Sequence, residues 1–236
     1  MVKGSIDSIE SMGLVDGPGV RTVVFLTGCR LRCKFCHNPE MWIKRADNIT
    51  PEELVEKLKR FKPYYEASNN GGVTFSGGEP LLQPTFLIEV CKLLKAANIH
   101  IALDTSGVGT GNYDELLKYI DLVILDIKHV IPSLYRDITG EEMTYFNQFV
   151  TSLNESNKPC YIRQVIVPGI NDNMVYLNQL HAFLKGIKHI EKVEFLPYHK
   201  LGSEKYIALG IKNPYIAVPA MDIDKCQELY NSFMKI

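Results

Sequence analysis

Short apolar runs alternate with longer amphipathic segments along this chain. The runs are rich in Val, Ile, Leu and Phe, and they are nearly continuously apolar, which is typical of parallel strands buried on both faces. We expect strands near residues 21–28, 72–77, 99–105, 121–127, 160–167 and 191–198.

Helical periodicity fills the intervals between these runs. The first such segment is TPEELVEKLKRF, in which Thr50 can cap the helix, Pro51 suits its first position and Glu53 completes a capping box. Further helices are expected near residues 84–97, 113–119, 144–156, 174–187 and 220–234.

Strand–helix alternation predicts an α/β fold with parallel strands and right-handed crossovers. Six units are too few to close an eight-stranded barrel, so an open doubly wound sheet and a partial (β/α)6 TIM-like barrel both fit. The chain has 236 residues, and we find no internal repeat, low-complexity tract or linker. We therefore expect a single domain over residues 1–236.

Composition and charge narrow the class of protein. Apolar residues make up 46% and charged residues 22%, and the net charge is −1, so neither nucleic acid nor an anionic membrane is expected as a main partner. No apolar run has the length of a membrane span, and the N-terminal MVKGSIDSIESMG lacks the apolar core of a signal peptide. We expect a cytoplasmic protein, whose thiols stay reduced.

The segments that follow the six expected strands are rich in glycine, charge and metal-ligand residues. They read TGCRLRC, SGGEP, DTSG, DIKH, VPGIND and LPYHKLG. Parallel α/β folds place their sites at the carboxyl ends of the strands. Six such ends point to one shared site, which favours a sheet curved around a common centre.

Half of the cysteines lie in GCRLRCKFCHNPE, residues 28–40, with the spacing Cys29-x3-Cys33-x2-Cys36. A [4Fe–4S] cluster normally takes four thiolates, so three would leave one iron open to a non-protein ligand. A zinc site with His37 as fourth ligand is the alternative, but the chain has no second pair of ligands of the zinc-finger kind. The remaining cysteines are scattered and are expected to be buried structural thiols: Cys91, Cys160 and Cys226.

This cysteine spacing, with an aromatic residue before the third cysteine, resembles the cluster motif of the radical S-adenosylmethionine (SAM) enzymes. SGGEP at residues 76–80 resembles their second motif, which holds the methionine amino group. Seven segments occur in the order found in the pyruvate formate-lyase activating enzymes: SMGLVDGPGVR, CHNPEMW, GGVTFSGGEP, LDTSG, LDIKH, IRQVIVPGIND and LPYHKLG. They extend from about residue 5 to 210, and the chain after residue 211 carries no motif of the family.

The resemblance implies a radical SAM fold and a reaction. Cys29, Cys33 and Cys36 would hold the [4Fe–4S] cluster, and its open iron would chelate SAM. Reductive cleavage of SAM would give methionine and a 5′-deoxyadenosyl radical, which abstracts a glycine Cα hydrogen from pyruvate formate-lyase. The cofactors carry this chemistry, so no further catalytic side chain is implied. The family also implies a flavodoxin or ferredoxin-type electron donor, and we expect a monomer.

Residues in these motifs acquire roles from the resemblance. The loop at Phe35 and His37 would meet the adenine, the Gly78 carbonyl region the amino group, and Lys128 the carboxylate of SAM. The residues expected to contact SAM are Phe35, Cys36, His37, Gly78, Asp126, Ile127, Lys128 and His199. Each also has a structural alternative, such as a core aromatic, a bare turn or a buried ion pair.

Charged residues near the strand ends suggest three more expectations. Asp104, Thr105 and Asp126 could hold a monovalent cation, as relatives do, although strand-end hydrogen bonding explains them nearly as well. Arg163 lies within an apolar run and must therefore have a partner. Asp16 either seats a substrate loop or belongs to a plain turn.

Two other functions remain open from the sequence. The chain could activate a different glycyl-radical enzyme, although many such activators carry a cysteine-rich insert and residues 37–76 contain no cysteine. It could also be a non-catalytic zinc or electron-transfer protein, which would not need the glycine-rich and charged strand ends.

Overall fold

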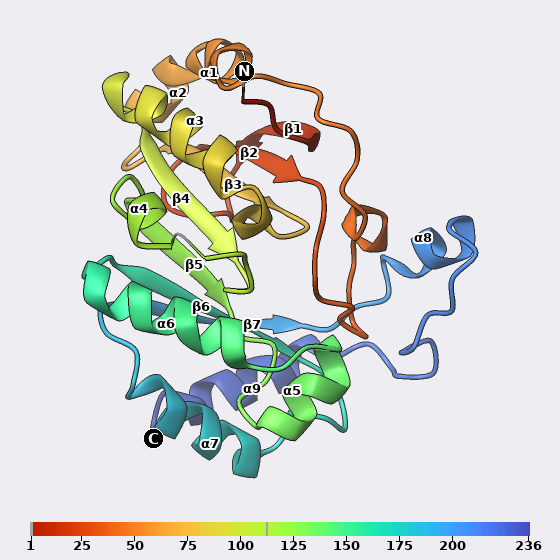
Figure 1. Ribbon diagram of the computed structural model, residues 1–236. Coiled ribbons are helices and arrows are strands. Elements are labelled where there is room, and N and C mark those ends of the chain that lie inside the picture. The colour runs from red at the N-terminus through yellow and green to blue at the C-terminus, as the bar shows by residue number, and fades with distance from the viewer. Residues whose placement is uncertain (1, 112) are drawn as a thin grey trace.

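A curved seven-stranded sheet lies at the centre of the computed structural model, which describes residues 2–111 and 113–236 (Figure 1). The strands follow one another in the sheet in chain order: β1 (Ile6–Gly13), β2 (Arg21–Leu26), β3 (Gly72–Gly77), β4 (His100–Thr105), β5 (Leu122–Asp126), β6 (Cys160–Ile166) and β7 (Ile190–Pro197). Strands β2 to β7 are parallel, and β1 is antiparallel to β2. Among the described residues β1 and β7 remain at opposite edges, so the barrel is not closed.

The described helices are α1 (Pro51–Lys59), α2 (Lys62–Glu66), α3 (Pro84–Ala96), α4 (Tyr113–Leu117), α5 (Pro132–Thr139), α6 (Thr144–Ser156), α7 (Met174–Leu184), α8 (Ser203–Ala208) and α9 (Ile223–Phe233), with short 3-10 helices η1 (Pro39–Met41) and η2 (Pro80–Leu82). Most of them cover the convex face of the sheet, whereas α8 lies apart from the sheet and contacts η1 (Figure 1). None of the helices described is long and apolar enough to cross a membrane.

All six predicted strands are present, and they are the six parallel ones, which confirms the partial barrel. The predicted capping box also forms: Thr50 Oγ1 accepts from the Glu53 amide at 3.2 Å, and the Glu53 carboxylate accepts from the Thr50 amide at 2.8 Å. Strand β1 and helices α2, α5 and α8 were not predicted. The edge strand β1 is hard to find in the sequence because IDSIESMG has few apolar positions; its residues, apart from Ile6, are partly buried or exposed.

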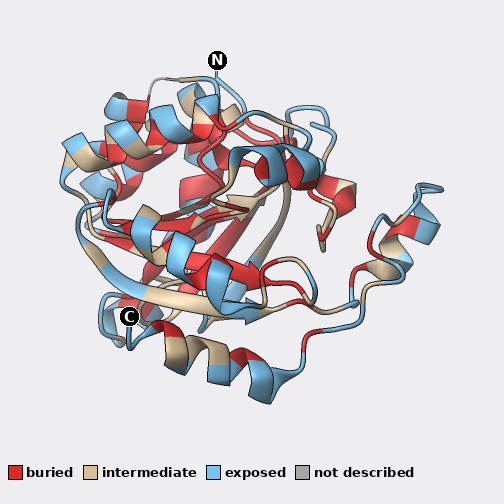
Figure 2. Ribbon diagram, turned by 90° about the horizontal axis from the view of Figure 1, so that it is seen from below, coloured by how far each residue is buried: buried red, intermediate tan, exposed pale blue. Residues whose placement is uncertain are grey.

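The main core lies between the convex face of the sheet and the helices, and it runs from Ile6 to Phe233 (Figure 2). A second, small cluster of Ala102, Leu122 and Ile124 fills part of the concave face. The segment after residue 211, for which no motif was found, contributes α9, which packs on β7 through Phe233 and Phe195, with ring centroids 5.2 Å apart.

The amino-terminal ends of three strands are tied together by a buried arginine. Arg21 is fully buried; its Nε donates to Thr74 Oγ1 at 2.9 Å, and its Nη1 donates to the Asn70 carbonyl at 3.0 Å and lies 3.1 Å from His100 Nδ1. Arg21 thus fixes the amino-terminal ends of β2, β3 and β4. The loops that carry the predicted site residues follow the opposite, carboxyl ends of these strands.

Candidate active site

The cysteine loop follows β2 and is fastened at both sides. The Cys29 amide donates to the Trp42 carbonyl at 3.1 Å, which closes the loop on itself. The Arg32 amide donates to the Thr139 carbonyl at 2.7 Å, so the loop also rests on the last turn of α5. These backbone bonds hold the loop over the carboxyl ends of the strands.

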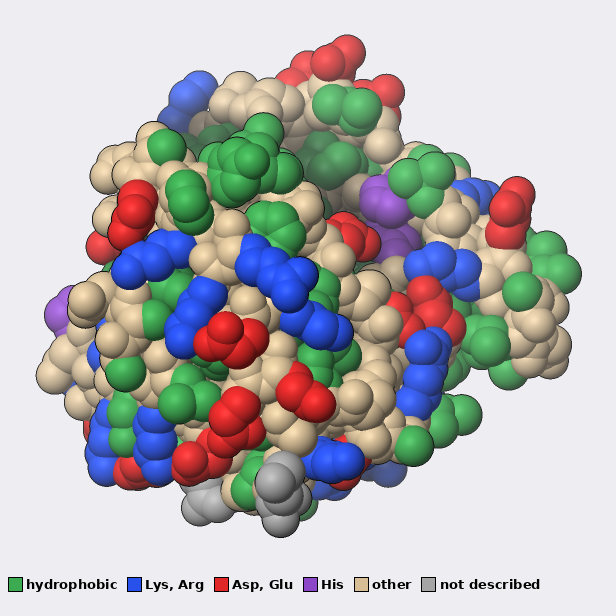
Figure 3. All heavy atoms as spheres, turned by 90° about the horizontal axis from the view of Figure 1, so that it is seen from above, with side chains coloured by type: hydrophobic (Ala, Val, Ile, Leu, Met, Phe, Trp, Pro, Cys, Tyr) green, Lys and Arg blue, Asp and Glu red, His purple; other side chains and the backbone are tan. Residues whose placement is uncertain are grey.

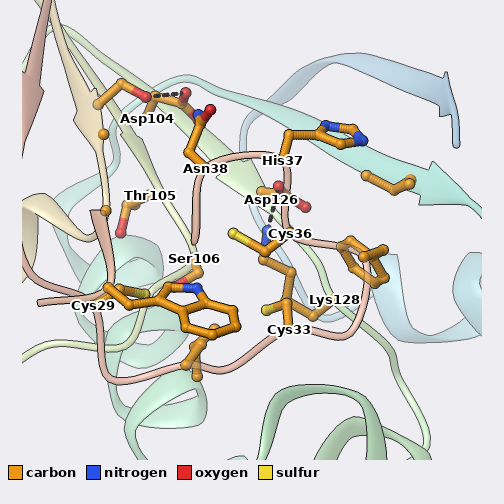
Figure 4. A pocket seen from close by; sticks show the side chains of 17 residues that line it. Cys29, Cys33, Cys36, His37, Asn38, Asp104, Thr105, Ser106, Asp126 and Lys128 are labelled. Atoms are coloured by element: carbon orange, nitrogen blue, oxygen red, sulfur yellow. Dashed lines mark hydrogen bonds and ion pairs between the residues drawn. The ribbon is translucent and has the colours of Figure 1, made fainter. Parts of the chain in front are cut away.

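One pocket collects the predicted residues from the loop and from four strand ends (Figure 4). The surface is visibly hollowed beside histidine side chains (Figure 3). Most of the residues singled out in the sequence line this pocket: Cys29, Cys33, Phe35, Cys36, His37, Gly78, Asp104, Thr105, Asp126 and Lys128. The structure therefore brings together side chains that are up to 99 residues apart in the chain (128 − 29).

The three cysteines fit a cluster better than a single ion. Within the described part of the chain, no three His, Cys, Asp or Glu side chains converge as the ligands of one metal ion would. The His37 Nε2 lies 3.1 Å from the His199 carbonyl, so this nitrogen is occupied elsewhere. Cys29, Cys33 and Cys36 instead surround the pocket together, and three thiolates around a shared space suit a cube with one open iron.

Burial governs the chemistry of the free thiols. It raises the pKa of Cys29 to about 12 and also raises the pKa values of Cys33 and Cys36, while the Lys128 ammonium opposes this effect at all three. Without metal the thiols are thus protonated at neutral pH. Metal ligation requires them to lose these protons, and Lys128 is the cation in the pocket that favours the thiolates.

Asp126 and Lys128 face each other at the end of β5. The Lys128 Nζ lies 2.5 Å from Asp126 Oδ2. Burial alone would lower the pKa of Lys128, but the charge of Asp126 opposes it and the pKa is raised, so the ammonium is retained. The predicted shared orientation of the two side chains is confirmed. Ile127 points the other way into the main core, so only its backbone is available to the pocket.

Gly77 and Gly78 follow β3 where no larger residue fits. Gly77 has a φ of 117°, which side chains rarely allow, and a Cβ on Gly78 would lie 2.3 Å from the Gly28 carbonyl oxygen. The chain therefore passes close beneath the cysteine loop and offers its backbone to the pocket, as the motif predicted.

Glu79, the next residue, was overlooked in the sequence. Its side chain is fully buried and accepts from Thr105 Oγ1 at 2.6 Å, from Ser106 Oγ at 2.5 Å and from the Leu81 amide at 3.0 Å. Burial raises its pKa, and these hydrogen bonds oppose the shift. Glu79 therefore connects the end of β4 to the glycine turn. The sequence signal that could have revealed this role is a charged residue within GGEPLL, which otherwise contains only glycine and apolar residues.

The His37 and His199 rings stack at 3.8 Å between centroids, with their planes 9° apart. His37 lines the pocket, whereas His199, which was also predicted to contact SAM, does not line it and instead stacks on the His37 ring. Burial, followed by the charge of His199, lowers the pKa of His37, so this ring is neutral at pH 7.

Arg163 has the partners that its position demanded. Its Nε lies 3.0 Å from Glu194, and its Nη1 lies 3.7 Å from Asp104 and 4.0 Å from Asp16. It also donates to the Val15 carbonyl. The arginine thus links the loop after β1 to the carboxylates of the pocket and of β7.

Comparisons with known proteins agree with this geometry. Residues 23–177 match the model of the radical SAM superfamily. The chain is 51% identical over 230 residues to the pyruvate formate-lyase-activating enzyme of Clostridium pasteurianum, covering 97% of this chain and 96% of the relative. It is 42% identical to the enzyme of the same name from Staphylococcus epidermidis, covering 98% and 95%. This chain belongs to the pyruvate formate-lyase-activating enzymes of the radical SAM superfamily.

Solved structures support the fold. A domain of a pyruvate-formate lyase-activating enzyme from Bacteroides vulgatus superposes with a TM-score of 0.57 at 24% identity, covering 70% of this chain and 94% of that one. SuiB of Streptococcus suis bound to S-adenosylmethionine gives 0.64 at 16% identity, covering 89% and 46%. At these identities the likeness concerns the fold alone, and it confirms the predicted radical SAM barrel.

Proposed function

We propose that this chain activates pyruvate formate-lyase by removing a hydrogen from the Cα of one of its glycines, leaving a glycyl radical. The observation that carries the proposal is a single pocket in which three cysteines meet Gly78, Asp126 and Lys128 at the carboxyl edge of an open barrel. The identity of 51% to a curated activating enzyme over nearly the whole chain supports the same reaction.

Cys29, Cys33 and Cys36 would hold a [4Fe–4S] cluster, which would supply the electron for the reductive cleavage of SAM. The protein's task is to bind and orient. Lys128 pairs with the SAM carboxylate, and the backbone at Gly78 accepts from the amino group. Phe35 and His37 flank the adenine, with His199 supporting His37 from behind.

Asp126 has two tasks in this proposal. It holds Lys128 in place at 2.5 Å and faces the ribose of SAM. The pocket-lining Asp104 and Thr105 provide, with Asp126, hard oxygens for a monovalent cation. Asp104 already accepts from Ser76 at 2.7 Å, and Thr105 already donates to Glu79, so the cation would add to an existing network of hydrogen bonds.

The open side of the barrel explains how a protein can be the substrate. The sheet does not close between β1 and β7, and Leu14 and Val15, on the loop after β1, are 72% and 75% exposed. A flexible glycine loop of the partner can enter across this edge, whereas a closed barrel would exclude it. Arg163 and Asp16 stand where that loop would pass.

The remaining partners belong to the same proposal. The electron comes from a flavodoxin or ferredoxin-type donor, and Cys29 and Cys36 are both partly exposed, so the cluster would lie near the surface. The six cysteines form no disulfide, which suits the reducing cytoplasm, and we propose that the chain works there as a monomer.

Electron paramagnetic resonance tests the proposal. Pyruvate formate-lyase is incubated anaerobically with this protein, SAM and a reductant, and a glycyl radical signal on pyruvate formate-lyase is expected. The Cys33→Ala protein is the control and should give none. A signal that appears on a different glycyl-radical enzyme, with none on pyruvate formate-lyase, would assign another partner.

A further inference from the structure

Trp42 ends the motif CHNPEMW and has no role yet in the proposed reaction. It is the only tryptophan of the chain, and its partly buried side chain lines the pocket together with Cys29 and Cys36. Its backbone carbonyl accepts the Cys29 amide at 3.1 Å, which ties the residue to the first cysteine of the loop. The indole thus forms part of the wall around the space that the cysteines share.

One support of the indole is Arg32. The guanidinium carbon lies 5.2 Å from the centre of the Trp42 ring, within the range of a cation–π contact. The same guanidinium donates through Nη1 to the Cys29 carbonyl at 2.7 Å and to the Leu31 carbonyl at 2.9 Å. Arg32 therefore connects the indole to the backbone of the first cysteine.

The second support comes from α8. Tyr206 is buried, and its ring meets the Trp42 ring edge-on, with centroids 5.9 Å apart and planes at 84°, an arrangement that aromatic pairs favour. The Tyr206 hydroxyl donates to the Cys36 carbonyl at 3.0 Å. The Lys205 ammonium, which donates to Asn38 at 2.7 Å, fastens α8 beside the cysteine loop. Tyr206 therefore connects the indole to the backbone of the third cysteine.

We propose that Trp42 is a positioning residue for the cluster: held between Arg32 and Tyr206, its indole fixes Cys29 and Cys36 relative to each other and shields the cluster from water. The inference rests on the cluster of the proposed function. Each support of the indole bonds the carbonyl of one cluster cysteine, so loss of the indole should loosen both ligands at once. Groups that orient metal ligands and exclude solvent affect metal retention strongly, and their loss typically costs roughly ten- to hundredfold in metal affinity.

The test removes the indole and keeps an apolar side chain. Trp42→Leu is compared with wild type, with the conservative variant Trp42→Phe and with the matched control Phe195→Leu. Phe195 is also a partly buried aromatic residue, but it packs on α9 and lies outside the pocket. Each protein is reconstituted anaerobically, its iron and sulfide are counted, and the transfer of its iron to a chelator is timed. Urea denaturation of the proteins without cluster measures any general loss of stability.

Trp42→Leu should release iron roughly ten- to hundredfold faster than wild type, because the lost affinity appears as faster dissociation. Trp42→Phe should recover much of this difference, since its ring can still contact Arg32 and Tyr206. Phe195→Leu should release iron like wild type, even where it loses stability in urea. Equal rates in Trp42→Leu and wild type would overturn the inference. Equally fast release from Phe195→Leu would overturn it too, because the effect would then be a general loosening of the fold.

The single tryptophan supplies a second readout in the wild-type protein. An iron–sulfur cluster quenches the fluorescence of a neighbouring indole, so Trp42 should lose most of its emission when the cluster assembles. Unchanged emission from a protein that holds its full iron and sulfide would place the indole away from the cluster and overturn the inference.

Two failures are distinguishable from these outcomes. A wild-type protein that assembles no cluster contradicts the proposed function itself, and with it this inference. If Trp42→Leu does not fold, Arg32→Met is used instead, at an exposed position where the change removes the cation and both carbonyl bonds. It should also speed iron release, and release at the wild-type rate would overturn the proposal.

Discussion

The Lys128 ammonium and the Asp126 carboxylate, two residues apart at the end of β5, lie 2.5 Å from each other at the wall of the pocket. Both side chains are largely buried, so neither charge is well solvated. Asp126 keeps Lys128 charged and oriented before any ligand arrives. The pair is therefore a ready binding group for a carboxylate, and the ammonium has donors to spare for it.

Replacing Lys128 with methionine should weaken SAM binding and leave the cluster in place. A charge-assisted hydrogen bond contributes about 1.5–3 kcal/mol, which corresponds to roughly a ten- to hundredfold loss of affinity. Isothermal titration of the reconstituted protein measures this. Lys118→Met, on the exposed surface of the molecule, is the control and should bind normally. Unchanged affinity in Lys128→Met would return the residue to a structural role.

The cysteines should separate into ligands and core residues. Cys33→Ala should lose the cluster and all activation, because a cube held by two thiolates is not retained. Cys91 is fully buried in α3 outside the pocket, so Cys91→Ala should keep its iron and lose about 1 kcal/mol of stability. Iron analysis and urea denaturation measure the two effects. Wild-type iron content in Cys33→Ala would argue against the assigned ligands.

The histidine stack should respond to acid. The pKa of His37 is lowered below its ordinary value near 6.5, so the stack contributes to stability above pH 6.5 and loses this contribution as the pH falls through that lowered pKa. Removing His199 relieves both burial and charge, so the pKa of His37 should rise in His199→Ala. Proton NMR titration measures it, with His189→Asn at an exposed position as control. A pKa of His37 that stays the same would contradict this coupling.

The far end of the barrel should also be sensitive to acid. Burial, followed by the charge of Arg21, lowers the pKa of His100 to about 4. As the pH falls below 6.5, this histidine binds a proton in the unfolded chain but not yet in the folded chain. The free energy of unfolding therefore decreases between pH 6.5 and about 4. His100→Gln does not titrate and should lose less stability over this range, as urea denaturation at several pH values can show. Equal losses in both proteins would refute the assignment.

Much of the fold could be predicted because the parallel strands are buried on both faces. β2 and β5 read as short apolar runs that end near a glycine or an aspartate, which is typical of buried strands. β1 could not be found this way, because it pairs on one side only and is partly exposed. The short α5 was missed because its eight residues, PSLYRDIT, contain few apolar positions and so show little helical periodicity.

The site was predictable where the chemistry is local in the chain. Cys29, Cys33 and Cys36 are spaced within one loop, and Asp126 and Lys128 alternate along one strand, so their shared orientation could be predicted.

The need of Arg163 for a partner could be predicted from its position in an apolar run, but the identity of its partners could not. Asp16 and Glu194 lie 147 residues before and 31 residues after it (163 − 16 and 194 − 163), and only the pairing of the strands brings them together.

Hydrogen transfer from glycine is the most direct test of the account. A peptide with the glycine region of pyruvate formate-lyase, deuterated at the glycine Cα, is incubated with the reconstituted protein, SAM and a reductant. The 5′-deoxyadenosine formed is then examined by mass spectrometry. The account predicts that deuterium from the glycine appears in the 5′-deoxyadenosine. Unlabelled 5′-deoxyadenosine from a peptide that turns over would contradict direct abstraction at this site.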